Sequence, residues 1–236
     1  MTYQIIKDEL MAGATPQKAA DLSRFFKTGK GQYGEGDQFM GVTVPVIRQI
    51  VKKYKLVERD DIQKLLQDPY HECRMIALQL LVNQYKNSKQ DKSKQKEIFD
   101  FYLANTQFIN NWDLVDLSCG EIVGKYLYDK SREPLYQLAH SGFLWEERIA
   151  IISTLPYIKS DQFDDTLQIA KILLHHPHDL IHKAVGWMLR EIGKRDFEAE
   201  YQFLMENNRY QSMPRTMLRY AIEKFPEDLR QRILKS

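Results

Sequence analysis

Apolar and polar residues alternate with helical spacing along most of the chain. The predicted helices are about 10–17 residues long, and no segment with strand-like alternation stands between them. We expect helices over residues 3–11, 16–26, 46–54, 58–66, 70–85, 94–105, 112–128, 134–141, 145–157, 162–175, 180–195, 197–207, 214–225 and 227–235. The pattern therefore predicts an all-α protein.

Short turns separate these helices, and most of them contain proline or glycine. Clear cases are Asp68-Pro69, Ser141-Gly142, His176-Pro177, Met213-Pro214 and Phe225-Pro226. Short turns favour antiparallel helix pairs, and a spacing of about 35–45 residues between successive pairs is typical of HEAT-like repeats. Stacks of such pairs curve and bind partners on their concave face. We predict a single domain over residues 1–236, a superhelical stack of helix pairs.

Residues 29–44 are the one stretch that does not follow the helical pattern. Gly29, Gly31 and Gly34 formally match a dinucleotide fingerprint, but no strand precedes them and no apolar helix follows directly. We expect instead an inserted glycine-rich β-hairpin or long loop that turns near residues 34–37. Lys27 and Lys30 on its arm are candidate DNA contacts. An inserted binding element and a passive loop both remain open.

The most informative stretch is 110–124, where Leu114, Leu117 and Val123 mark an apolar helix face. Asn110 or Asn111 can cap the helix start. Trp112 and Asp116 are four residues apart and share a different face. A tryptophan and a carboxylate together on an outward face indicate a site rather than a core.

Two further tryptophans are followed by an arginine about one turn later. Burial in the core is the usual fate of tryptophan, but such pairs on successive repeats would line one surface, where arginines can hold phosphates. The candidate DNA-binding residues of this kind are Trp145, Arg148, Trp187 and Arg190. Arg215 and Arg219, four apart near a helix start, form either a second phosphate-contacting ridge or a solvated face.

Composition excludes several classes of protein. The chain of 236 residues has a net charge of +2 and only two cysteines, so a disulfide framework is not expected. Neither a signal peptide nor a membrane span is predicted, and a cytoplasmic location is expected. His178 and His182 share a helical spacing, but a metal site needs a third ligand, and the sequence offers none with matching spacing. We expect no metal and no cofactor.

Three segments resemble the AlkD-like family of HEAT-repeat alkylpurine DNA glycosylases, and the resemblance covers nearly the whole chain. They are Asn-Trp-Asp-Leu-Val-Asp at 111–116, Arg-Ile-Ala-Ile at 148–151, and residues 181–191, which include Gly186-Trp187. The resemblance implies a superhelix whose positively lined concave face holds duplex DNA. It also implies that Trp112 and Trp187 flank the sugar of the damaged nucleotide, that Asp116 is the catalytic carboxylate, and that Arg148 binds phosphate.

The chain also departs from the family pattern. Asn111 stands where the founding glycosylases have a second tryptophan, and Phe25 matches a tyrosine of the family. The glycine-rich insertion is similar to the hairpin of AlkF/AlkG-like branches, which favour branched DNA. Our first hypothesis is therefore a monomeric, nucleoid-associated (if bacterial) DNA repair protein that binds distorted or branched DNA without sequence specificity. The alternative is a monofunctional glycosylase that excises N3/N7-alkylated purines, and a protein–protein scaffold is a third possibility.

Overall fold

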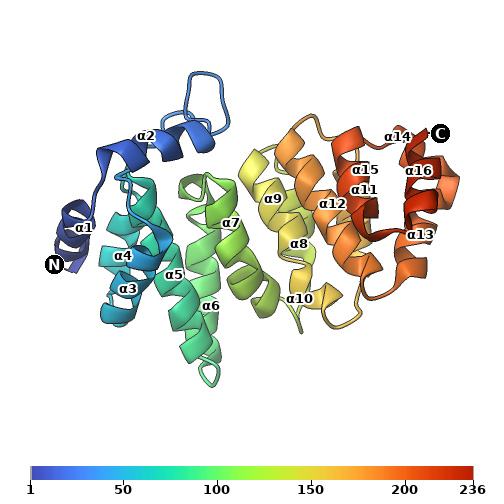
Figure 1. Cartoon of the computed structure of the whole chain (residues 1–236). Helices are drawn as coiled ribbons and strands as arrows, with labels where there is room; N and C mark the ends of the chain where they lie inside the picture. The colour runs from blue at the N-terminus through green and yellow to red at the C-terminus, as the bar shows by residue number, and fades with distance from the viewer. Residues whose placement is uncertain (1, 236) are drawn as a thin grey trace. The chain divides into compact units, whose positions relative to one another are not determined.

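The computed structural model describes residues 2–235 and is helical along most of its length (Figure 1). The α-helices are α1 (Thr2–Ala12), α2 (Pro16–Phe25), α3 (Val44–Lys53), α4 (Arg59–Leu66), α5 (His71–Asn87), α6 (Lys92–Leu103), α7 (Trp112–Cys119), α8 (Glu133–Ala139), α9 (Leu144–Ile152), α10 (Leu155–Ile158), α11 (Asp164–Ile172), α12 (Asp179–Gly193), α13 (Phe197–Met205), α14 (Arg209–Ser212), α15 (Arg215–Ala221) and α16 (Glu227–Lys235). Short 3-10 segments are η1 (Thr106–Phe108), η3 (Glu206–Asn208) and η4 (Ile222–Lys224), and η2 (Gly120–Gly124) is π-helical. Residues 2–235 contain no β-strand, and the predicted all-α architecture of helix pairs is confirmed.

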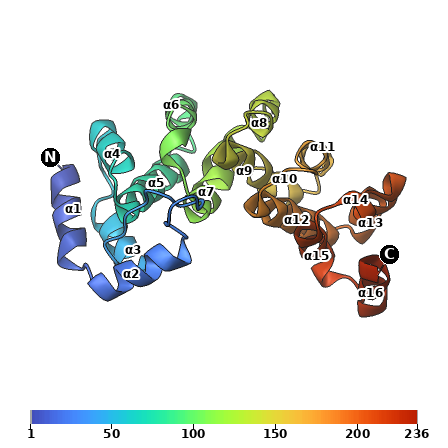
Figure 2. The same ribbon diagram turned by 90° about the horizontal axis from the view of Figure 1, so that it is seen from above.

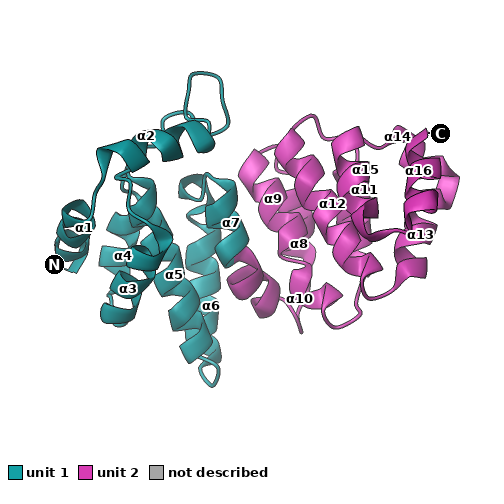
Figure 3. Cartoon of the chain, in the orientation of Figure 1, with its two compact units in different colours: residues 1–118 teal, residues 119–236 magenta. Residues whose placement is uncertain are grey.

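The chain divides into two compact units, residues 1–118 and 119–236 (Figure 3). The boundary lies inside α7, so the helix that begins at Trp112 ends in the second unit. The prediction of a single domain stays a prediction.

In the first unit, α5 is the central helix. It packs against α3 and α4, and most of its side chains are buried on every side, including Cys73, Ile76 and Leu80. Helix α2 lies crosswise to these helices and leads into the glycine-rich segment (Figure 2). A helix that is buried all round has no free polar face, so the polar side chains of α5 must find partners inside the protein.

In the second unit, α12 takes the central place and contacts α9, α11, α13 and α15. Gly186 allows α15 to approach very closely. A Cβ atom at this position would lie 2.5 Å from the carbonyl oxygen of Met217 and 2.5 Å from the Cβ of Tyr220. The glycine that the sequence places before Trp187 is therefore a packing requirement of the α12–α15 pair.

The glycine-rich segment between α2 and α3 forms consecutive turns and no hairpin. Its one ladder contact is an isolated parallel bridge between Gln38 and Tyr70. The predicted loop describes this segment, and the predicted β-hairpin is not confirmed. The physical reason is that its later residues bond to α5. The segment also packs closely against the start of α2, where Gly41 has a φ of +83° and a Cβ would lie 2.2 Å from the carbonyl oxygen of Thr15.

Candidate nucleic-acid interface

Asn111 determines how α7 begins. It is fully buried, its side-chain oxygen accepts a hydrogen bond from the backbone N–H of Trp112 at 2.9 Å, and its amide nitrogen donates to Asp37 at 3.1 Å. The first turn of α7 is thereby attached to the glycine-rich loop. Asn111, which departs from the family pattern, therefore has a structural role in this chain.

Trp112 belongs to an aromatic stack built from distant parts of the first unit. Its ring lies 5.4 Å from that of Phe26, which stacks on Phe39 at 5.1 Å, and Phe39 in turn stacks on His71 at 4.7 Å. Phe25 meets the Trp112 ring edge-on at 6.0 Å and is 63% exposed. Such offset and edge-to-face contacts are favourable ring geometries, and here they hold an exposed aromatic side chain against a half-buried one.

Beneath the rings lies a buried group of charged side chains. His71 donates from Nδ1 to Asp37 at 3.0 Å and from Nε2 to Asp113 at 2.9 Å, and Arg74 pairs with the other oxygen of Asp37. Burial disfavours a charged imidazole, but the hydrogen bonds to Asp113 and Asp37 outweigh it and raise the pKa of His71 to about 9. Burial likewise works against ionised Asp37, yet His71 and Arg74 hold its pKa below the usual value. Two carboxylates and two cations thus neutralise one another.

The two acids of α7 therefore have different surroundings. One oxygen of Asp113 accepts from His71 and the other accepts from the backbone N–H of Leu114 at 2.9 Å. Asp116 is half-buried and lies one turn after Trp112, on the face that the spacing predicts. Asp113 belongs to the buried charge cluster, whereas Asp116 follows Trp112 by four residues, a spacing that puts both on one face of α7.

The base of the glycine-rich loop is fastened to α5, and its tip is exposed. The carboxylate of Glu72 accepts hydrogen bonds from the backbone N–H groups of Met40, Gly41 and Val42 at 2.9–3.2 Å. Lys27 and Lys30 are both exposed, and the Lys27 ammonium lies 5.9 Å from the ring centroid of Tyr33. The loop thus presents cations directly beside the aromatic stack, because Lys27 follows Phe26.

The candidate residues of the second unit differ in how far their side chains are exposed. Trp145 and Arg148 are 4% and 5% exposed, and Arg148 donates to the carbonyl oxygen of Leu180 at 2.6 Å. Because both side chains are buried, little of their surface is accessible to DNA in this structure. Trp187 is half-buried and its indole N–H donates to Glu191 at 3.1 Å.

The other predicted arginines of the second unit are more accessible than Arg148. Arg190 is half-buried and pairs with Glu223. Arg215 and Arg219 on α15 are exposed, and Arg215 donates to the carbonyl oxygen of Leu234 at 2.7 Å. Their role as phosphate contacts stays a prediction.

Several residues of the site escaped the sequence analysis, namely Asp37, Phe39, His71, Glu72 and Arg74. They come from the loop and from the first turn of α5. A usable signal was present, because three of them are polar residues that open a helix and are followed directly by the apolar residues 75–78. Polar side chains on such a helix need buried partners.

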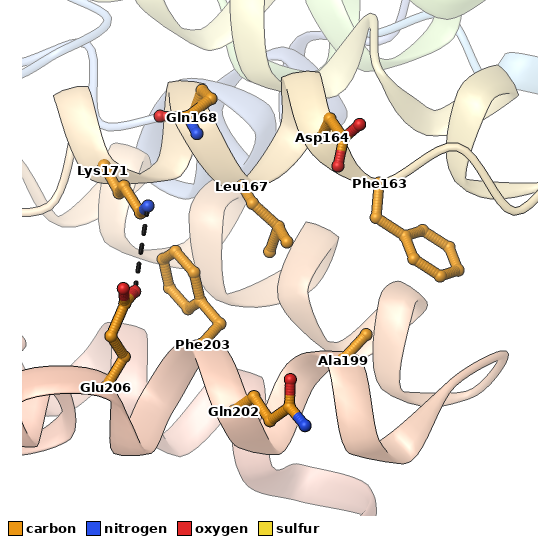
Figure 4. Close-up of a pocket in the computed structure, with 9 residues that line it drawn as sticks. All are labelled: Phe163, Asp164, Leu167, Gln168, Lys171, Ala199, Gln202, Phe203 and Glu206. Atoms are coloured by element: carbon orange, nitrogen blue, oxygen red, sulfur yellow. Dashed lines mark ion pairs between the residues drawn. The ribbon is translucent and has the colours of Figure 1, made fainter.

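A hollow of about 460 Å³ in the second unit holds none of the predicted residues. It lies between α11 and α13, with Leu167 and Phe203 inside it and a Lys171–Glu206 pair at 3.8 Å on its edge (Figure 4). It is wide open and shows no convergent set of polar groups of the kind that orient a small ligand. We assign it no part in the site.

The pair His178 and His182 bears on a metal site, and the length and apolarity of the described helices bear on a membrane span. No group of three or more histidine, cysteine, aspartate or glutamate side chains among residues 2–235 is arranged to hold a metal ion. The histidines after α11 serve local structure, since His178 Nδ1 accepts from the N–H of Leu180 at 3.1 Å and His176 pairs with Glu147. None of the described helices combines the length and apolarity that a membrane span needs.

The fold and this interface define a helix-pair protein with an aromatic and cationic face. Over residues 6–225 the chain matches the family model for DNA alkylation repair enzymes, and it therefore belongs to that family. Among solved structures it is similar to a protein described as a predicted DNA alkylation repair enzyme from Enterococcus faecalis. The two share 17% identity with a TM-score of 0.68, over 91% of this chain and 97% of the other, a likeness that shows the fold. Comparison with curated proteins gave no match. Family membership supports a role in DNA repair.

Proposed function

We propose that this protein binds distorted or branched DNA without sequence specificity through the face formed by Phe25, Trp112, Lys27 and Lys30. The observation that carries the proposal is the exposed Phe25 ring held edge-on against Trp112, with the exposed Lys27 two residues and the exposed Lys30 five residues further along the chain. Exposed aromatic rings stack on bases that have left a regular duplex, and this contact tolerates any base. Lysines attract the phosphates and carry no sequence information.

The proposal is tested by replacing Phe25 with alanine. Because Phe25 is largely exposed, F25A should fold normally and lose about tenfold in affinity for a four-way junction or a duplex with unpaired bases. Affinity for an intact duplex of equal length should change much less. Fluorescence anisotropy with labelled DNA measures all of these.

Phe143, an exposed phenylalanine of the second unit, provides the matched control. F143A should bind all of these DNAs like the wild type. Equal affinity of F25A and wild type for the junction would contradict the proposal. Binding that does not weaken as salt is raised would count against any DNA-binding role and favour the protein scaffold.

A second candidate is excision of N3- or N7-alkylated purines, which the position of Asp116 favours. An alkylated purine is cationic, so it leaves as a neutral base with the electron pair of the bond between its nitrogen and C1′. The sugar becomes oxocarbenium-like, water adds to C1′, and one proton is released. A carboxylate next to an electron-rich ring can stabilise that cation. The spacing of four residues between Trp112 and Asp116 on α7 puts both on one helix face and supports this candidate.

Release of N7-methylguanine from methylated DNA tests the second candidate. D116N should abolish release and leave duplex affinity nearly unchanged, because it removes the charge and keeps the shape. D100N is the control, because Asp100 is exposed on α6 and pairs with Lys96 at 2.6 Å, and this variant should release base like the wild type. Equal release by D116N and wild type would exclude Asp116 as the catalytic carboxylate. No release by the wild type would leave DNA binding as the activity.

A further inference from the structure

His71 connects two elements that are distant in sequence. Its Nδ1 reaches Asp37 in the glycine-rich loop, 34 residues away, and its Nε2 reaches Asp113 in the first turn of α7, 42 residues away. The His71 and Asp37 side chains are 2% and 0% exposed, and that of Asp113 is 15% exposed, so the ring is shielded from solvent on the loop side and nearly so at α7. One imidazole ring thus spans the gap between the loop and the helix that carries Trp112.

The surroundings of His71 make both contacts depend on its charge. Asp37 from the loop and Asp113 from α7 face the ring, while Arg74 from α5 and Asn111 before α7 also bond Asp37. A neutral imidazole has a single N–H, so it could donate to only one carboxylate. The other carboxylate would then face the lone pair of the unprotonated ring nitrogen in place of an N–H donor, which is unfavourable inside the protein.

We propose that His71 is a positioning residue that couples the glycine-rich loop to the first turn of α7, so that the loop and Trp112 move as one unit when DNA is contacted. The inference rests on the proposed function, because it links two parts of the proposed DNA-binding face. A displacement of the loop by DNA is passed through Asp37 and His71 to Asp113, the neighbour of Trp112. By reciprocity, a change at Trp112 alters the loop by the same free energy.

Hydrogen–deuterium exchange on the free protein tests the coupling without DNA. H71Q can donate to only one of the two carboxylates, so exchange should become about tenfold faster in residues 29–42 and in residues 111–118 together. I76V is the matched control, since Ile76 is fully buried on the same helix and the change removes one methylene. I76V should leave the exchange rates of residues 29–42 and 111–118, relative to the rest of the first unit, as they are in the wild type.

A pH series separates coupling from a merely structural role. After correction for the intrinsic rate, wild-type exchange should rise in both segments between pH 7 and 10 with one shared midpoint. H71Q should show no such step, because it lacks the titrating group. NMR titration of the His71 imidazole should give the same midpoint.

Several results would overturn the inference. Faster exchange in residues 29–42 with no change in residues 111–118, or the same pH step in H71Q as in the wild type, would show that His71 transmits nothing. If H71Q does not fold, D113N provides the test instead. The asparagine side chain keeps an oxygen that can accept from Nε2 but lacks the negative charge, so exchange in residues 29–42 should still become faster. Unchanged exchange in residues 29–42 would refute the coupling. If both segments respond to H71Q but the wild type binds no DNA, the coupling stands and the proposed function fails.

Discussion

Individual carboxylates in this protein differ by their surroundings more than by their sequence context. Asp113 and Asp116 are three residues apart on α7, yet one is held by a buried histidine and the other lies beside the tryptophan. Glu200 on α13 is a carboxyl group in a third kind of environment. It is 1% exposed, and its Oε1 has no hydrogen-bond partner within residues 2–235. Burial raises its pKa to about 9, although the positive charge of Arg190 acts in the opposite direction.

Glu200 should make folding depend on pH. Between about pH 4.5 and 9 the unfolded chain has lost the proton that the folded chain keeps, so stability falls as pH rises through this window. E200Q should flatten this dependence, removing a slope of up to about 1.4 kcal/mol per pH unit. Denaturant unfolding at pH 5 and pH 8 measures it.

Glu198 is exposed on the same helix and gives the control. E198Q should show the wild-type dependence. A residual slope remains in every variant from His71, whose raised pKa also makes stability fall between about pH 6.5 and 9. Identical pH profiles for E200Q and wild type would mean that Glu200 does not titrate as an isolated buried acid.

At the scale of elements, hydrogen bonds and packing against other helices determine the conformation of segments whose local sequence is compatible with more than one structure. Residues 29–44 are rich in glycine, and such a pattern is compatible with a hairpin or a loop. The loop forms because Glu72 accepts the N–H groups of residues 40–42 and because Asp37 bonds with His71 and Arg74. These partners lie on another helix, so the local sequence could not indicate them.

The α12–α15 pair gives the clearest prediction at this scale. Alanine is a better helix former than glycine, so G186A would stabilise an isolated helix. Here its Cβ would meet backbone and Cβ atoms of α15 at 2.5 Å, which must move. We expect G186A to destabilise the protein by about 1–3 kcal/mol, measured by urea unfolding.

Gly120 in η2 is the control for this effect. A Cβ there would have its nearest neighbour, the carbonyl oxygen of Ile152, at 3.8 Å, an ordinary contact. G120A should therefore be neutral or stabilise the protein by up to about 1 kcal/mol. Equal effects of the two substitutions would show that α15 accommodates the extra methyl group without cost.

For the whole molecule, net charge says little about DNA binding. A value of +2 is close to neutral, so an interaction with phosphates must depend on where the cations lie. In the first unit, exposed lysines adjoin the aromatic stack, and in the second, exposed arginines lie on α15. Each unit thus offers cations of its own, next to side chains that its own packing holds in place.

The sequence by itself determined the all-helical architecture and where most helices begin, although the predicted helix 112–128 changes to π-helical η2 after Cys119 and the predicted helix 145–157 is divided into α9 and α10. Helical periodicity, prolines and short turns are local properties, so they can be predicted from neighbours in the chain. Only the tertiary structure decided the burial of Trp145 and Arg148, the loop in place of a hairpin, and the cluster of Asp37, His71 and Asp113. These depend on residues dozens of positions apart, which meet only when the helices pack.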